Sequence, residues 1–390
     1  MRPKLMEQIE GLRGENSVKI KEAHEAGKKV VGMYCVFSPS EIALAADAIS
    51  VTLCGTTQEP IEAAERDLPR NLCPLIKSSY GFAITDTCPY FFFSDALLAE
   101  TTCDGKKKMY ELMGEIKPMH IMNLPQTAED EDSLPIWRKE MDKFKNFLEN
   151  EFDVEITDEK LRDAIKLMNR ERDVMKRVHK LNAHKPAPLS GMDLLKAQWL
   201  KGFNVDKEHG INLMEQLIEE VEERIADGKF AFDEKAPRIL VTGCPTGVGG
   251  ADKVMISLEE AGASVVALEN CTGYKGLDVM VDEDENKDPM DALAEKYLST
   301  PCSCMTPNNS RLDLIKRLAD EYQADGVLDL TWQACHTYAI ESLTVKKFVE
   351  NELGLPFIQI ETDYSESDVG QIDTRVQAFL ETIDTNKVMA

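Results

Sequence analysis

Residues 28–54 read KKVVGMYCVFSPSEIALAADAISVTLC, and this stretch holds a strand, a helix and a second strand. Lys28–Cys35 and Ile49–Cys54 are short apolar runs typical of buried strands. Pro39–Asp47, between them, has the pattern of a helix. A strand–helix–strand unit of this kind predicts two parallel strands. Both predicted strands end in a cysteine.

The same alternation continues further along the chain. More strands are predicted at Phe91–Ala99, Arg238–Thr242, Ser264–Leu268, Gly326–Leu330 and Phe357–Glu361. Residues from about 151 to 230 are instead charged and helical. The pattern predicts an α/β protein with two doubly wound parallel-sheet domains, flavodoxin-like or Rossmann-like, and a helical insert. We assign residues 1–150 to the N-terminal domain, 151–235 to the insert and 236–390 to the C-terminal domain.

Composition narrows the classes of function. The 390 residues carry a net charge of −25, which argues against binding to nucleic acid or to an anionic membrane surface. No run of about 20 apolar residues is present, and the N-terminus has no stretch suited to a signal peptide. We therefore expect a cytoplasmic protein. Because structural disulfides are rare in that compartment, the ten cysteines need another explanation.

Most of the cysteines fall where predicted strands end or helices begin. Cys35, Cys54, Cys244 and Cys271 lie at or just past a strand end, Cys103 and Cys335 lie between a strand and a helix, and Cys73 begins a helix. Open α/β sheets bind ligands at the carboxyl ends of their strands, so two facing domains would gather these thiols in one cleft. Cys88 precedes its strand and is expected at the far edge.

Thiolates in such a cleft are suited to soft metals and iron–sulfur clusters. A helix N-terminus stabilises a thiolate by its dipole and free N–H groups, which fits Cys73, Cys103 and Cys244. There is no C-x-x-C pair, and this counts against a zinc ribbon, a thioredoxin-type dithiol and a bacterial ferredoxin. The alternative is that the cysteines are small buried packing residues.

Three weaker features surround these cysteines. The glycine-rich stretch 243–250 matches neither G-x-G-x-x-G nor a P-loop ending in Gly-Lys-Ser/Thr. It favours a tight turn of the backbone around a buried site. Lys106–Lys108 is either a solvated helix start or positive charge near an anionic cluster. His336 is either a proton carrier beside Cys335 or an ordinary helix-start residue. The other histidines are expected at the surface.

Several stretches resemble the 2-hydroxyacyl-CoA dehydratase and benzoyl-CoA reductase family. They are NLCPLIKSSYG at 71–81, TTCDGKKKM at 101–109, ENCTG at 269–273, QACH at 333–336, ETDYS at 361–365 and QIDTR at 371–375. The resemblance covers nearly the whole chain. It implies an iron–sulfur cluster between two α/β domains, held by Cys73, Cys103 and Cys335. It also implies a partner, an ATP-hydrolysing iron–sulfur activator that delivers electrons at low potential.

The chain departs from the dehydratase pattern in its extra cysteines, which are Cys35, Cys54, Cys88, Cys244 and Cys304. In this respect it is most similar to the double-cubane cluster proteins, which are homodimers with two sulfide-bridged cubanes and six cysteine ligands per protomer. The resemblance therefore implies three further ligands from the same cleft. Cys35, Cys244, Cys271 and Cys304 are the candidates, and Cys54 and Cys302 are reserves.

Three functions follow from these alternatives. The first is reduction of small, hard-to-reduce molecules at a double-cubane [8Fe-9S] cluster charged by the activator, with His336 assisting proton delivery. ATP would enter only through that activator. The second is a 2-hydroxyacyl-CoA dehydratase subunit with a single [4Fe-4S] cluster. The third is a non-catalytic low-potential electron carrier.

Overall fold

Two four-stranded parallel sheets form the centre of the protein in a computed structural model, which describes residues 2–250 and 252–389. The first sheet has the order β2 (Ile49–Thr52), β1 (Val30–Met33), β3 (Ala96–Glu100), β4 (Met119–Met122). The second repeats this order with β6 (Ser264–Leu268), β5 (Arg238–Gly243), β7 (Gly326–Trp332), β8 (Phe357–Thr362). Every pairing is parallel, so the predicted α/β class with two doubly wound sheets is confirmed.

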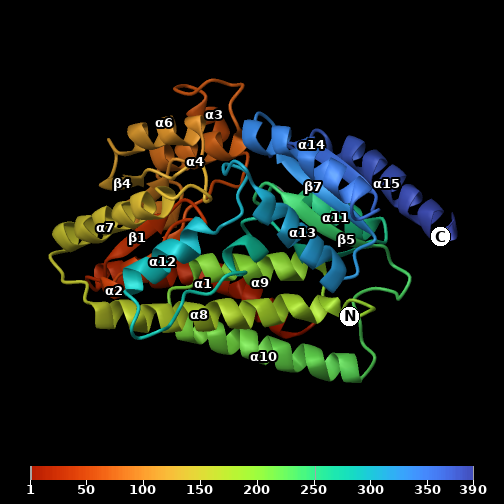
Figure 1. The fold of residues 1–390 in the computed structure, drawn as a ribbon, viewed down its shortest axis with the longest axis horizontal. Helices are drawn as coiled ribbons and strands as arrows, with labels where there is room; N and C mark the ends of the chain where they lie inside the picture. The colour runs from red at the N-terminus through yellow and green to blue at the C-terminus, as the bar shows by residue number, and fades with distance from the viewer. Residues whose placement is uncertain (1, 251, 390) are drawn as a thin grey trace.

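Helices cover both sheets, as parallel strands buried on two faces require. Around the first sheet lie α2 (Ser40–Ala45), α3 (Ile61–Ala64), α4 (Pro74–Thr85), α5 (Pro89–Phe92), α6 (Asp104–Met113) and α7 (Ser133–Phe152). Around the second lie α11 (Asp252–Glu260), α13 (Asn309–Glu321), α14 (His336–Asn351) and α15 (Val369–Met389). The two sheets lie side by side in Figure 1.

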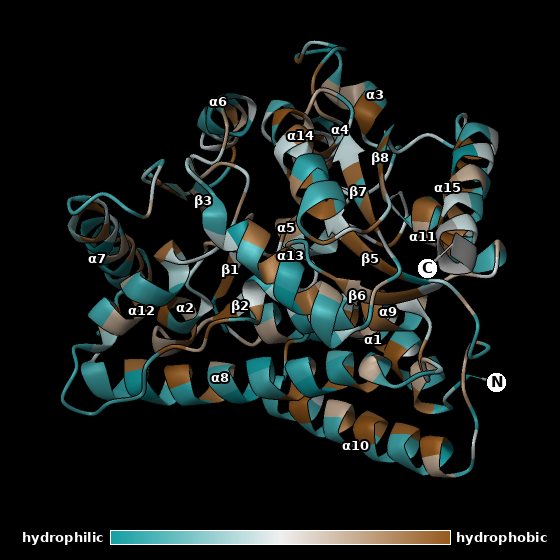
Figure 2. Ribbon diagram, turned by 45° about the vertical axis from the view of Figure 1, so that its right-hand side comes forward, coloured by the Kyte–Doolittle hydropathy of each residue, from teal (hydrophilic) through white to brown (hydrophobic). Residues whose placement is uncertain are grey.

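A layer of long helices lies beneath both sheets. It consists of α1 (Leu5–Glu25), α8 (Asp158–Lys180), α9 (Gly191–Phe203) and α10 (Lys207–Ala226). In Figure 2, α8 and α10 run along the lower edge, and α8 is largely hydrophilic, whereas β5 is largely hydrophobic. The helices share their own apolar cluster, to which α1 contributes Met6, Ile9 and Leu12. No helix in the described ranges is long and apolar enough to cross a membrane.

One helix from the second half of the chain packs on the first sheet. Residues Pro289–Leu298 form α12, which contacts α7. Met290 and Leu293 belong to the same apolar cluster as Val31 and Leu98 of the first sheet. The segment that follows α12 therefore returns towards the second sheet across the space between the two. The boundaries at 150 and 235 stay a prediction.

The start of the third strand differs from the prediction. Pro89–Phe92 is a short helix, and the strand begins only at Ala96. Pro89 occupies the first helical position, where its missing N–H costs nothing and its fixed φ favours the helix. The strand β4 is not in the sequence prediction, because it is four residues long and only its last residue is buried.

His179 corrects the expectation that this histidine lies at the surface. Its side chain is fully buried on α8, and its ring packs edge-on against Tyr274 at 5.4 Å. Burial lowers the pKa of His179 to about 4, because the charged imidazolium would lose its hydration.

A buried ion network lies within the second sheet and its helices. Arg311 of α13 is fully buried, donates to Thr242 at 2.9 Å and pairs with Glu341 of α14. Glu269, 3.6 Å from Arg311, also pairs with Lys275 at 3.3 Å. These charges are mutually dependent, since each would be costly to bury alone.

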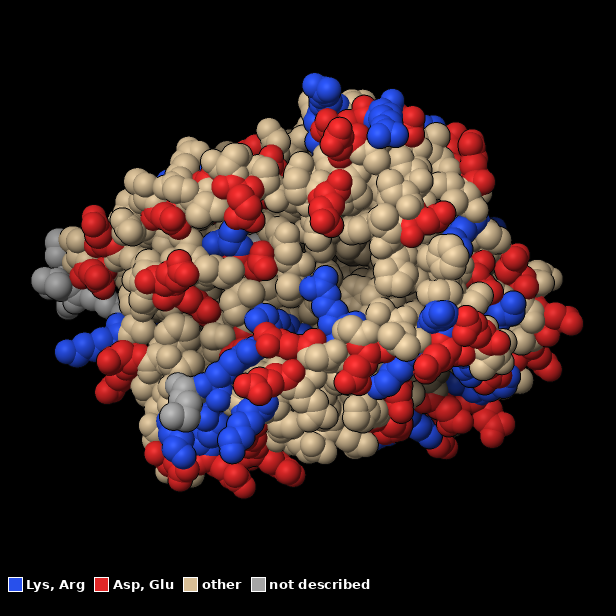
Figure 3. All heavy atoms as spheres, turned by 180° about the vertical axis from the view of Figure 1, so that it is seen from behind, with Lys and Arg blue, Asp and Glu red and all other residues tan. Residues whose placement is uncertain are grey.

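The surface reflects the acidic composition. In Figure 3, Asp and Glu side chains are spread over the whole visible face, which is hollowed near its centre. This distribution agrees with the net charge of −25.

We predict that His179→Phe makes the protein less sensitive to acid. The unfolded histidine takes up a proton near pH 6.5, whereas the folded one does so only near pH 4. The folded protein therefore loses stability as the pH falls through this window, by about 2 kcal/mol between pH 7.5 and 5. Urea unfolding at the two pH values should show a smaller loss in the variant. His184→Phe, at an exposed site, should behave like the wild type. An equal acid loss in His179→Phe and wild type would contradict the prediction.

We predict that Arg311→Met destabilises the fold by about 3–5 kcal/mol, because the substitution leaves buried carboxylates without their cation. Arg317 lies on the same helix, and its pair with Asp278 at 2.7 Å is half-exposed. Arg317→Met should therefore cost less than about 1 kcal/mol. Chemical unfolding of both variants measures the difference, and similar losses would refute the role given to Arg311.

Candidate functional site

The cysteines meet where the carboxyl ends of the two sheets face each other. Contacts across this cleft join loops of both halves: the Tyr364 hydroxyl donates to the Gly55 carbonyl at 2.9 Å. The Thr56 hydroxyl donates to the Val248 carbonyl at 3.4 Å. Six strands deliver a cysteine within three residues of their ends, namely Cys35 after β1, Cys54 after β2, Cys103 after β3, Cys244 after β5, Cys271 after β6 and Cys335 after β7.

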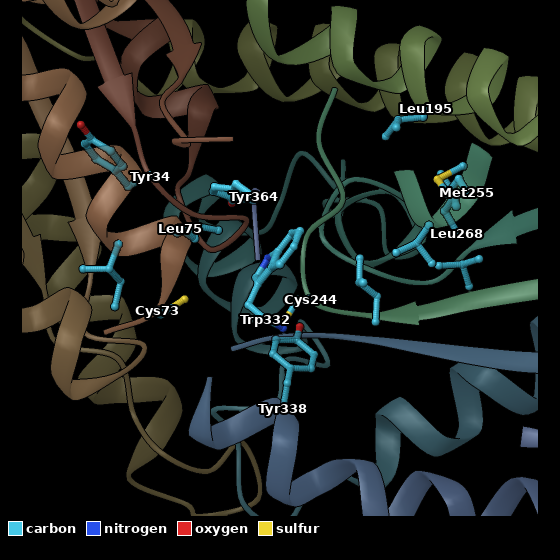
Figure 4. Packing of buried hydrophobic residues seen from close by; sticks show 14 of the residues in the cluster. Tyr34, Cys73, Leu75, Leu195, Cys244, Met255, Leu268, Trp332, Tyr338 and Tyr364 are labelled. Carbon is cyan, nitrogen blue, oxygen red and sulfur yellow. The ribbon is translucent and has the colours of Figure 1, made fainter. Parts of the chain in front are cut away.

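Four of these thiols form what we call the first thiol group: Cys73, Cys103, Cys244 and Cys335. Cys244 and Cys335 lie close enough together for each thiol to act on the pKa of the other. Cys73 lies near enough to Cys335 and Cys103 for their charges to act on its pKa. In Figure 4 the Cys73 sulfur points from the first half of the chain towards the side where Cys244 and Trp332 lie.

Backbone groups hold the first thiol group in place. Cys103 is the N-cap of α6, and its sulfur accepts the Lys106 N–H at 3.4 Å. Cys73 precedes Pro74 at the start of α4. The Cys244 sulfur accepts the Trp332 N–H at 3.3 Å. Helix N-termini and free N–H groups stabilise negative charge on sulfur.

The second thiol group comprises Cys35, Cys271, Cys302 and Cys304. Cys302 lies close enough to Cys271 and Cys304 for both thiols to act on its pKa. Cys35 lies near enough to Cys302 for the charge of Cys302 to act on the pKa of Cys35. Tyr338 lies beneath this group, with its hydroxyl 4.0 Å from the sulfurs of Cys271 and Cys302. The Lys275 ammonium donates to that hydroxyl at 2.8 Å, which links the group to the buried ion network.

Burial controls the protonation of these thiols. It raises the pKa of Cys35 and of Cys73 to about 12, because a thiolate there would lack hydration. The neighbouring Cys244 thiol lowers the pKa of Cys335 to about 7. Without a bound cation most of the set therefore stays protonated. All ten cysteines are free of disulfides.

The donor set fits an iron–sulfur cluster better than a single ion. Sulfur is the ligand that iron–sulfur clusters prefer, and the two thiol groups supply only sulfur. Within residues 2–250 and 252–389, no three His, Cys, Asp or Glu side chains are close enough to hold one metal ion. A cluster spans a larger space, with cysteines around its outside. The ligand role of each cysteine stays a prediction.

A cavity of about 170 Å³ adjoins the second thiol group. Cys35, Cys54 and Cys271 lie on its wall, together with Lys106. The Lys106 side chain turns inward and donates to the Tyr34 carbonyl at 3.4 Å, whereas Lys107 and Lys108 are exposed. Of the three lysines, Lys106 thus places its positive charge beside the thiols, whereas Lys107 and Lys108 form the solvated helix start.

The glycine-rich stretch 243–250 provides close packing at the cleft. Gly243 has φ of 105°, and a Cβ there would lie 2.1 Å from the Leu330 carbonyl oxygen. A Cβ on Gly250 would meet the Thr56 carbonyl oxygen at 2.5 Å. The turn therefore needs glycine so that β5 can end beside β7 and the loops of both halves can touch.

Three other residues singled out by the sequence lie apart from the two thiol groups. Cys54 faces the cavity, with its sulfur 3.8 Å from the Tyr34 carbonyl oxygen. Cys88 caps α5, and no described hydrogen bond joins it to another cysteine. His336 is exposed at the first residue of α14.

The sequence pattern supports Cys302 only as a reserve ligand, yet its thiol lies at the centre of the second group. Its loop follows α12, which the pattern does not predict. The signal available was the spacing Cys302-x-Cys304, the one close pair in the sequence.

Comparison with known proteins agrees with this architecture. Residues 35–383 match the family described as 2-hydroxyglutaryl-CoA dehydratase, D-component. The chain is 48% identical to the "Putative dehydratase subunit YjiM" of Escherichia coli K12 over 98% of both chains. It is 24% identical to the (R)-phenyllactyl-CoA dehydratase beta subunit of Clostridium sporogenes, over 93% of this chain and 94% of that one.

A shorter match links the chain to a benzoyl-CoA reductase subunit of Thauera aromatica, at 27% identity over 43% of this chain and 40% of that one. The names of the long matches favour the dehydratase alternative over the reductase expectation. The match over residues 35–383 establishes the resemblance that the cysteine stretches indicated. The chain belongs to the 2-hydroxyglutaryl-CoA dehydratase D-component family.

Proposed function

We propose that this chain is an iron–sulfur enzyme that reduces small molecules at a double-cubane cluster bound between its two sheets. The observation that carries the proposal is the pair of thiol groups, each with four cysteines, on one cleft. One cubane needs no more than four cysteine ligands, so a single cubane leaves about half of these thiols without a role.

An electrostatic interaction between the two groups supports one extended cluster. The charge of Cys302 in the second group acts on the pKa of Cys335 in the first. The cluster would supply electrons one at a time at low potential, at a value set by hydrogen bonds, net charge and burial. The chain's own groups would contribute the N–H donors at Cys103 and Cys244 and the cation at Lys106.

Electrons would come from an ATP-hydrolysing iron–sulfur activator, and ATP would be used only by that partner. A homodimer is part of the same proposal. His336 is the proposed proton donor. Its exposed place at the start of α14, next to Cys335, would give it access to water.

A second function, a 2-hydroxyacyl-CoA dehydratase subunit, is favoured by the names of the long matches. In this case Cys73, Cys103 and Cys335 would hold one [4Fe-4S] cluster, and the chain would need a second, different chain as its partner. The second thiol group would then be packing beside the substrate. About four irons per chain and elimination of water from a 2-hydroxyacyl-CoA are its expected properties.

We predict about eight irons per chain in protein purified without oxygen, the content of two cubanes. Cys302→Ala should lower the iron content by about half, since Cys302 joins Cys271 and Cys304. Cys73→Ala should lower it by at least as much. Iron and acid-labile sulfide analysis with a visible spectrum gives both numbers.

Cys88→Ala is the matched control, because it removes a half-buried cysteine outside both groups. It should keep the wild-type iron content. About four irons in the wild type, unchanged by Cys302→Ala, would overturn the double-cubane proposal in favour of the dehydratase function.

A further inference from the structure

The cavity beside the second thiol group has two chemically different ends. One end carries Cys35, Cys54, Cys271 and Lys106. The other is lined by cations from three helices: Arg172 of α8, Lys201 of α9 and Lys296 of α12. The rest of the lining is mostly apolar or hydroxylated, with Leu75, Met168 and Phe203 among the apolar residues.

Charge at the cation end is only partly balanced. Arg172 pairs with Glu41 and donates to the Tyr297 hydroxyl at 3.1 Å, and that hydroxyl donates to Glu41 at 2.7 Å. The nearby Lys207 pairs with Glu171 at 3.1 Å. Glu41 and Glu171 are therefore already paired with Arg172 and Lys207, and neither is paired with Lys201 or Lys296.

The ammonium groups of Lys201 and Lys296 have no such partner. Within the described ranges neither makes a hydrogen bond or an ion pair, and Lys296 instead lies 3.8 Å from the centre of the Tyr297 ring. Lys296 is only 4% exposed, and Lys201 is half-buried. Burial lowers the pKa of Lys201 to about 8 and that of Lys296 well below its ordinary value, because an ammonium group there loses hydration.

The cation end is separate from the thiols. The charged groups that act on Lys296 are Arg172, Glu41 and Lys201, and no cysteine is among them. The cysteines act instead on Lys106 at the other end. The positive charges of Lys201 and Lys296 are therefore placed to face a negative charge in the cavity other than that of a cluster.

We propose that this cavity binds a small anion, a carboxylate or oxyanion of a few heavy atoms, with its charge at Lys201 and Lys296 and its remainder towards the thiol end. The volume of about 170 Å³ is below that of ordinary drug-sized pockets, and this favours a small ligand. The binding site stands on the cavity and its unmatched cations. Its role as the substrate site rests on the proposed function.

Calorimetric titration of the anaerobically purified protein tests this site. Acetate and inorganic phosphate are the probes, and acetamide is the neutral match for acetate. Acetate should bind at least about tenfold more tightly than acetamide. Lys201→Met and Lys296→Met should each weaken acetate binding by about tenfold or more, as expected when one charge-assisted hydrogen bond is lost.

Lys176→Met is the matched control. Lys176 is a half-buried lysine on α8 that donates to the Asp278 carbonyl and does not line the cavity. It should bind acetate like the wild type. Equal binding of acetate and acetamide, no binding of either anion, or unchanged affinity in both lysine variants would overturn the inference.

Iron analysis of the same samples separates this inference from the proposed function. Loss of iron in Lys201→Met or Lys296→Met would assign these cations to the cluster and also overturn the anion site. Eight irons without anion binding would leave the cluster proposal standing alone. Anion binding with four irons would keep the site and remove the double cubane.

Discussion

Burial of thiols at the meeting point of two parallel sheets is the constraint on which the rest of the structure depends. The strand order places β1 and β3, and likewise β5 and β7, on either side of a point where the connections diverge, and ligands bind at such points. Burial keeps most of the thiols protonated, as the raised pKa of Cys73 shows. Only a bound cation or cluster would turn so many buried sulfurs into ligands at neutral pH.

The surrounding structure compensates for charge in this region. Backbone N–H groups face Cys103 and Cys244, and Lys106 lies among the cysteines of the cleft. Below the second thiol group, Tyr338 connects the sulfurs to Lys275 and Arg311, whose guanidinium carbon is 4.9 Å from the tyrosine ring. The second thiol group is thus connected to the buried ion network, whereas the ammonium groups of Lys201 and Lys296 make no ion pair within residues 2–250 and 252–389.

Sequence patterns predict the sheets because local periodicity determines which segments are buried strands. The same patterns place Cys35, Cys103 and Cys335 at the cleft, since parallel strands end on one side. They fail where tertiary packing decides. The α12 segment crosses to the first sheet and carries Cys302 into the cleft, and nothing local in Pro289–Leu298 signals that crossing.

Long-range packing also explains the other differences. His179 and Lys296 are polar side chains that become buried because helices from distant segments cover them, and Lys201 becomes half-buried in the same way. The residues at the cation end of the cavity come from three helices, α8, α9 and α12. This grouping of charge therefore appears only once the chain is folded.

Iron anomalous diffraction from crystals grown without oxygen tests the central claim most directly. The account predicts iron sites in one continuous cluster between the two thiol groups. Its ligands would be Cys73, Cys103 and Cys335 from the first group and cysteines around Cys302 from the second. Iron confined to Cys73, Cys103 and Cys335, with the second thiol group unligated, would contradict it.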